Sequence, residues 1–233
     1  MKIKINPSQA LLAARGRLAL CGGILIATLT AGTLFAAPNV KTLGGGVSAS
    51  HSGYVNGETL YALFNSPKGL ALDSSGDLFI ADYGNNAIRE ITDISGANNG
   101  STTTYVTTGI SAPVGVAIDQ SDNLFVLNRG GTGAFSTNGS VVEYDKYGIL
   151  VATNATHLTN AAAMAIDLAG NLYVTERTNL VIKISGGTQT PVTAVTESNA
   201  LLEGIAVLPS GALAVCDSGR NGIYNIDPGT GIW

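Results

Sequence analysis

The chain contains 233 residues, of which 45% are hydrophobic, 12% are charged and 30 are Gly. A chain of this length has one or two domains and can bury a hydrophobic core. The formal net charge of −4 argues against nucleic acid as a partner, because such binding needs clustered Lys and Arg. Low charge together with abundant Gly, Val, Ile, Thr and Asn favours an all-β protein with many tight turns.

The N-terminal segment differs from the rest of the chain. Lys2, Lys4, Arg15 and Arg17 precede an uncharged apolar run over residues 18–37, the order typical of a secretory signal peptide. The run is also close to the roughly 20 residues of a membrane span, so an uncleaved anchor is the alternative. We expect residues 1–37 to be a signal peptide or anchor and residues 38–233 to form the folded domain. The location is then periplasmic or secreted, or membrane-anchored through residues 18–37.

Removal of residues 1–37 leaves 8 basic against 16 acidic residues, a net charge of −8. We therefore expect no nucleic-acid partner, and membrane contact only through an uncleaved N-terminal segment. Cys216 is the one cysteine beyond residue 37, so an internal disulfide is not possible in the domain.

Four similar units follow one another after residue 63. Each has a short apolar strand, a tight turn, a second apolar strand, a polar loop and a third strand. Aligning Asp73, Asp119, Asp167 and Pro209 gives spacings of 46, 48 and 42 residues, close to the period of about 40–45 residues of propeller blades. A Thr- and Val-rich strand ends the first three units, so the predicted blade has four antiparallel strands.

The first unit carries a recognisable set of residues, namely Pro67, Gly69, Asp73, Gly76, Ala81, Asp82, Asn86, Ile88 and Arg89. This set resembles the NHL repeat, and the resemblance extends more weakly over roughly residues 39–233. It implies an all-β fold, a β-propeller of NHL-like four-stranded blades with four blades recognisable.

The number of blades leaves two interpretations. NHL-like propellers commonly have six blades, whereas residues 38–233 supply four and a fraction. In one interpretation residues 40–43 complete the fourth blade and close a four-bladed ring. In the other, which we favour, the chain is a truncated six-bladed propeller, since residues 231–233 resemble the start of another outer strand.

Candidate metal ligands and acid–base groups are few. Asp73, Asp119 and Asp167 recur at one turn position, which predicts hydrogen bonds to nearby backbone N–H groups. His51 and His157 are too few for a histidine-based zinc site. No catalytic residue is assigned and no cofactor is expected, with a divalent cation such as calcium left open.

Charged residues near the ends of the second strands suggest structural ion pairs. The expected pairs are Asp82–Arg89, Glu176–Lys183 and Asp217–Arg220. A resemblance to gluconolactonase-like propellers, which coordinate one divalent cation through Glu, Asn and Asp, implies a different use for Glu203, Asn128 and Asp217. It makes a metal-dependent hydrolase or lyase the alternative function.

One end of the blades gathers the polar loops, and loops are where binding chemistry concentrates. The loops joining second to third strands share this end with the segments leading into each blade. The sequence therefore predicts an exported, non-enzymatic binding scaffold for a protein, glycan or small-molecule ligand. The candidate ligand-binding residues are Asn65, Tyr83, Asn128, Arg129, Glu176, Arg177, Glu203, Asp217 and Arg220.

Overall fold

The computed structural model describes residues 20–21, 24–25, 42–45, 52–94, 100–131, 136–194 and 199–230. The chain divides into two compact units, Met1–Lys41 and Thr42–Trp233. In the first unit, β1 (Leu20–Cys21) pairs antiparallel with β2 (Ile24–Leu25). The rest of the predicted signal peptide or anchor lies outside the described residues. Within the described ranges, no helix is both long and apolar enough to cross a membrane.

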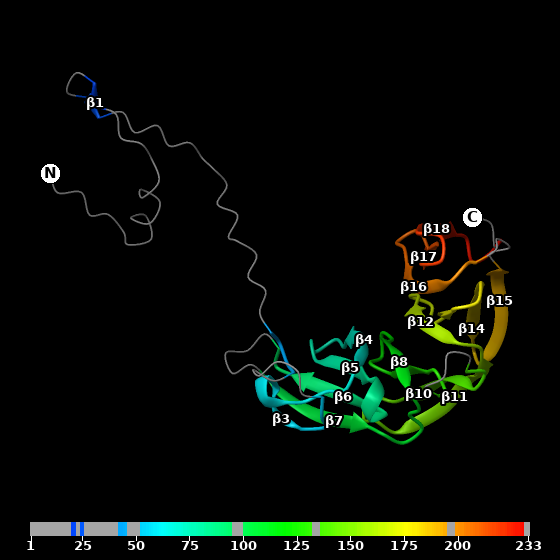
Figure 1. Ribbon diagram of the computed structural model, residues 1–233, viewed down its shortest axis with the longest axis horizontal. Coiled ribbons are helices and arrows are strands. Elements are labelled where there is room, and N and C mark those ends of the chain that lie inside the picture. The colour runs from blue at the N-terminus through cyan, green and yellow to red at the C-terminus, as the bar shows by residue number, and fades with distance from the viewer. Residues whose placement is uncertain are drawn as a thin grey trace. The chain divides into compact units, whose positions relative to one another are not determined.

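Four antiparallel sheets, the predicted blades, follow one another in chain order in the second unit (Figure 1). Blade 1 contains β4 (Pro67–Leu72), β5 (Leu78–Asp82), β6 (Ala87–Thr92) and β7 (Ser101–Val106). Blade 2 contains β8 (Pro113–Ile118), β9 (Leu124–Asn128), β10 (Gly139–Tyr144) and β11 (Leu150–Leu158). Blade 3 contains β12 (Ala161–Ile166), β13 (Leu172–Glu176), β14 (Leu180–Ser185) and β15 (Thr188–Ala194). Blade 4 contains β16 (Leu202–Val207), β17 (Leu213–Asp217) and β18 (Gly222–Ile226).

The segment before blade 1 adds to that blade's outer edge. There β3 (Gly57–Glu58) pairs with β7 as a fifth strand, which the repeats did not predict, and the short 3₁₀ turn η2 (Thr59–Tyr61) follows it. The Gly45 N–H donates to Thr59 O at 3.4 Å. Thr42 and Leu43, the described half of the segment considered for ring closure, are not in a strand. Residues 231–233 lie outside the described part of the chain.

Aspartate side chains close the first turn of three blades, as predicted. Asp73 Oδ1 accepts the backbone N–H groups of Ser75 and Asp77 at 2.9 and 2.8 Å. Asp119 and Asp167 make the same two contacts in blades 2 and 3. In blade 4 the alignment of Pro209 with these aspartates is wrong by one residue, because Leu208 occupies the position. The Leu208 N–H donates to Ala212 O and the Gly211 N–H donates to Leu208 O, both at 2.8 Å, and these backbone hydrogen bonds close the turn.

Neighbouring blades pack through their inner strands, in the order β4, β8, β12 and β16. A Cβ on Gly69 would lie 2.8 Å from Gly115 Cα, so β4 and β8 approach through their backbones. Because side chains alternate along a strand, Val116 packs in the cluster shared with blade 1, whereas Ala117 packs in the cluster shared with blade 3. Among the described residues no comparable packing joins β16 to β4.

Ala117 and Ala206 occupy the same repeat position but differ in solvent exposure. Ala117 is 6% exposed in the cluster between blades 2 and 3, whereas Ala206 is exposed. We expect Ala117→Leu to overpack its cluster and lower the free energy of unfolding by about 1–3 kcal/mol. The control Ala206→Leu should change it by less than about 0.5 kcal/mol. Urea unfolding in dilute protein measures both, and equal midpoints for the two variants would contradict the assigned register.

Candidate functional site

The last residue of each second strand is a buried hydrogen-bond acceptor. Asp82, Asn128, Glu176 and Asp217 end β5, β9, β13 and β17 and are at most 5% exposed. Each accepts a backbone N–H from the lead-in loop, the segment just before the inner strand of its own blade. The donors are Asn65 at 2.7 Å, Ser111 at 3.0 Å, Thr159 at 2.6 Å and Leu201 at 2.9 Å. Every lead-in loop is thus tied to the second strand.

Three of these acceptors, Asn128, Glu176 and Asp217, are among the predicted ligand-binding residues. Asn128 also donates to Gly109 O at 2.8 Å. Asp217 Oδ2 accepts the Tyr224 hydroxyl at 3.1 Å. Their polar atoms serve the fold, so we leave these three side chains out of the candidate site.

The same hydrogen bonds decide how the cation set implied by gluconolactonase-like propellers fits this chain. The side-chain oxygen of Asn128 and both carboxylate oxygens of Asp217 already accept protein donors. With Glu203 held by Arg177, these residues do not fit a shared cation site. Among the described residues, no group of three or more His, Cys, Asp or Glu is placed to hold a metal ion.

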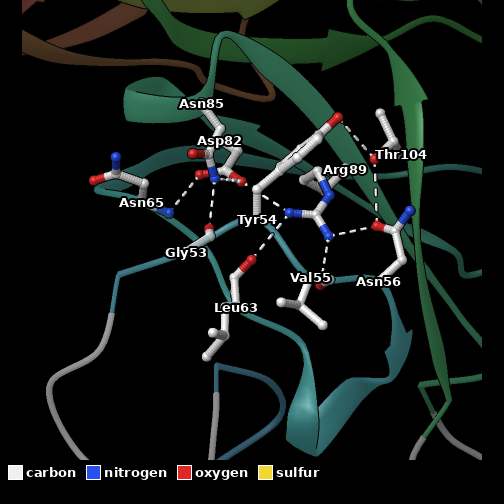
Figure 2. Close-up of polar contacts among 10 residues, drawn as sticks. All are labelled: Gly53, Tyr54, Val55, Asn56, Leu63, Asn65, Asp82, Asn85, Arg89 and Thr104. Atoms are coloured by element: carbon white, nitrogen blue, oxygen red, sulfur yellow. Dashed lines mark hydrogen bonds and ion pairs between the residues drawn. The ribbon is translucent and has the colours of Figure 1, made fainter.

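The predicted pair Asp82–Arg89 is formed and is fully buried (Figure 2), with Arg89 Nη1 3.0 Å from Asp82 Oδ2. The guanidinium also donates to the carbonyls of Leu63 and Val55 at 3.1 and 2.8 Å. The final acceptor is Asn56 Oδ1 at 2.6 Å. Figure 2 shows these acceptors converging from the segment before blade 1. Arg89 therefore fastens that segment to the sheet.

The predicted pair Glu176–Lys183 is wrong, because the loop after β13 is one residue shorter than the loop after β5. Asp82 lies opposite Ala87, whereas Glu176 lies opposite Leu180. The position equivalent to Arg89 is then the apolar Ile182. Lys183 lies opposite Tyr173, with its Nζ 5.9 Å from the ring centroid.

Side chains at the loop end also join neighbouring blades. Asn86 Oδ1 accepts the Ala112 N–H at 2.7 Å, across blades 1 and 2. Arg129 Nη2 donates to Asn160 Oδ1 at 2.6 Å, across blades 2 and 3. Within blade 3, the backbone N–H of Arg177 donates to the backbone carbonyl of Asn160 at 3.1 Å. These contacts place Arg129, a predicted site residue, in a polar connection that the sequence did not reveal.

A partly exposed ion pair continues this polar connection into blade 4. Arg177 Nη2 lies 3.0 Å from Glu203 Oε2, and the side chains are 40% and 34% exposed. Asn86 and Asn160 were missed as bridging residues, although each has positive φ, of 49° and 50°. Asn tolerates this conformation well, so Asn before or after a strand was the available signal.

The two remaining predicted residues with accessible side chains are Tyr83 and Arg220. Tyr83 is partly exposed, and Lys68 Nζ lies 5.5 Å from its ring centroid. Arg220 is exposed in the loop after β17. Asn65 contributes its backbone N–H to the Asp82 contact. The candidate site, which we call the cationic loop face, is defined by Lys68, Tyr83, Arg129, Asn160, Arg177, Glu203 and Arg220.

The two ion pairs differ in burial, so they should differ in their effect on stability. Arg89→Met leaves Asp82 buried without its cation, and we expect it to cost about 3–5 kcal/mol of unfolding free energy. The matched change Arg177→Met breaks an exposed pair and should cost about 0–1 kcal/mol. Urea unfolding measures both variants. Similar losses for the two would show that Arg89 is not held as Figure 2 shows.

Burial raises the pKa of the Glu176 carboxyl, although the Thr159 N–H acts in the opposite direction. Its stabilising contribution is therefore present below the ordinary glutamate pKa of 4.5 and lost as the pH rises through the raised, folded-state value. Glu176→Gln keeps an acceptor oxygen without a charge, so we expect a higher Tm than the parent at neutral pH and similar Tm values in acid. Calorimetry across this range tests it, and a constant Tm difference at every pH would refute it.

Comparisons with known proteins agree with the fold. Residues 64–91 match the family model of the NHL repeat. Comparison with curated proteins gives no match. A protein of unknown function from Bacteroides thetaiotaomicron has a TM-score of 0.62 at 16% identity, over 82% of this chain and 48% of that one.

Two further solved structures have similar scores. A streptogramin B lyase has a TM-score of 0.57 at 14% identity, over 70% of this chain and 52% of the lyase. A candidate gluconolactonase has a TM-score of 0.56 at 16% identity, over 71% of this chain and 61% of the other. The matches span less than two thirds of all three solved structures, and at these identities the likeness shows the fold alone. The chain is therefore an all-β protein of propeller-type blades that carries an NHL repeat at residues 64–91.

Proposed function

We propose that the protein is an exported binding scaffold whose cationic loop face binds a ligand bearing carboxylate groups. The observation that carries this proposal is the separation of charge between the two ends of the blades. Among the described residues, and leaving aside the buried Arg89, the loop end has four basic side chains, Lys68, Arg129, Arg177 and Arg220. The opposite, turn end has eight acidic side chains, Asp73, Asp77, Asp93, Asp119, Asp122, Asp145, Asp167 and Asp227.

The acidic residues at the loop end do not cancel this positive character. Asp82 is paired with Arg89 inside blade 1, and Asp217 is buried and accepts three protein donors. Glu176 is buried and accepts the Thr159 N–H. Among the described residues of this end, Glu203 is the partly exposed acid, and it pairs with Arg177. A ligand carboxylate would replace Glu203 on a planar guanidinium, which suits bidentate contact with carboxylates.

An aromatic and an amide group lie beside these cations. Tyr83 offers a partly exposed ring next to Lys68, and Asn160 presents its amide to Arg129. The Tyr83 ring can stack on the polar body of a ligand, whereas Asn160 is buried and holds the Arg129 side chain in place. An acidic oligosaccharide fits this combination. The export part of the proposal rests on the basic start and the apolar run over residues 18–37.

Titration of the protein with oligogalacturonate by calorimetry tests the proposal. We expect binding that weakens with added salt, because exposed charges are screened. Lys68→Gln and Arg220→Gln should each lower the affinity about two- to fivefold, the size expected for an exposed ion pair of up to about 1 kcal/mol. The matched control Lys146→Gln removes a cation at the turn end and should leave the affinity unchanged.

Two comparisons make the result decisive. A neutral galacto-oligosaccharide of equal length should bind much more weakly, and equal binding would rule out recognition of the carboxylates. A calcium titration of the same protein distinguishes the scaffold from the alternative function, a metal-dependent hydrolase or lyase. Stoichiometric calcium binding would favour a metal-dependent hydrolase or lyase over the scaffold.

A further inference from the structure

The three junctions between blades share one construction. The inner strand of the following blade packs on the inner and second strands of the preceding blade. The following blade contributes large side chains, such as Val116 in blade 2 and Met164 in blade 3. The preceding blade contributes small residues of its inner strand, such as Ala71 and Ala117. At the inner strands, the first two junctions therefore pair large residues of the following blade, the large half, with small residues of the preceding blade, the small half.

Within the part of the chain that the structure describes, blades 1 and 4 expose one half each. In blade 1, Leu70 and Leu72 hold the positions of the large half and are 62% and 56% exposed. In blade 4, Ala206 holds the position of Ala71 and Ala117 in the small half and is exposed. Cys216, in the second strand β17, holds the position of Ala81 and is also exposed. Ile205, on the opposite face of β16, packs against blade 3. The exposed surfaces are thus the two complementary sides of one junction.

The hydrogen bond that joins blades 1 and 2 also has equivalent residues on the exposed sides of blades 4 and 1. In that junction Asn86, with φ of 49°, accepts the N–H of Ala112, which precedes a proline. Asn221 in blade 4 has φ of 56° and follows Asp217 at the spacing by which Asn86 follows Asp82. Ser66, with φ of 52°, precedes Pro67 as Ala112 precedes Pro113. Asn221 and Ser66 are both exposed.

The segment before blade 1 leaves the large half accessible. It contacts Arg89 in β6, and its strand β3 pairs with β7 at the outer edge. In each internal junction, the following blade makes contact through its inner strand. The corresponding strand of blade 1 is β4. Leu70 and Leu72 are exposed, so the described residues do not cover the face of β4 that carries them.

We propose that a second copy of this chain occupies these surfaces, with β4 of one copy packed on β16 and β17 of the other. The two halves lie on one chain, and each complements the other rather than itself. Such a contact is head-to-tail, and it repeats the packing that joins blade 1 to 2, blade 2 to 3 and blade 3 to 4. Repetition of a head-to-tail contact forms a closed ring or a longer chain of copies.

Sedimentation velocity of the full chain over a wide concentration range tests the proposal. We expect association that increases with concentration. Leu70→Asp, which places a charge in the large half, and Ala206→Asp, which places one in the small half, should each yield monomers. A mixture of the two variants should form a one-to-one dimer and nothing larger, because one intact junction remains between them.

Circular dichroism checks that each variant is folded, and Leu72→Asp with Cys216→Asp is the second pair if one fails. A chain that stays monomeric at every concentration overturns the proposal. So does association that persists in both variants, since the contact then lies elsewhere, for example in Met1–Lys41. Two monomeric variants that do not combine on mixing also overturn it.

Discussion

The buried acceptor that ends each second strand is the contact on which the loop face depends. Every lead-in loop has a backbone N–H that leaves the strand ladder and needs a partner away from water. Aspartate, asparagine and glutamate all supply it, across 16 or 17 residues of sequence. Arg129 and Arg177 directly follow Asn128 and Glu176. Fixing the acceptor therefore aims the next side chain at the neighbouring blade, and the polar connection across blades 2–4 follows from it.

The two ion pairs show how burial changes what a charge does. Arg89 is removed from water, and its cost of desolvation is offset by Asp82, two carbonyls and Asn56 together. These contacts fix the position of the segment before blade 1, because loss of any acceptor would leave the buried guanidinium without one of its hydrogen-bond partners. Arg177 keeps contact with water, so its partner can be exchanged without damage to the fold. The same chemistry thus fixes structure in blade 1 and remains available for recognition between blades 3 and 4.

Sequence reasoning reached the fold because the repeat period, the turn aspartates and the alternating strands are local signals. It also predicted correctly that the loops between second and third strands share one end of the blades with the lead-in loops. It could not separate buried from accessible groups there, since Asn128 and Arg129 are neighbours with opposite roles. A spacing of seven residues correctly gave Arg89 as the partner of Asp82 but wrongly gave Lys183 as the partner of Glu176. The loop after β13 is one residue shorter, which shifts the pairing of β14 with β13 by one residue. The bridges made by Asn86 and Asn160 depend on the adjacent blade, which no local pattern describes.

The contacts of Arg89 also have a consequence for limited proteolysis. Tyr54, Val55 and Asn56 surround the guanidinium from one side of the sheet. Cleavage before Gly53 leaves these contacts with Arg89 intact. Cleavage after Asn56 separates the contacting residues from β3 and would expose the buried guanidinium to water. The N-terminal border of the stable fragment is therefore set by the solvation of one side chain in β6, more than thirty residues further along the chain.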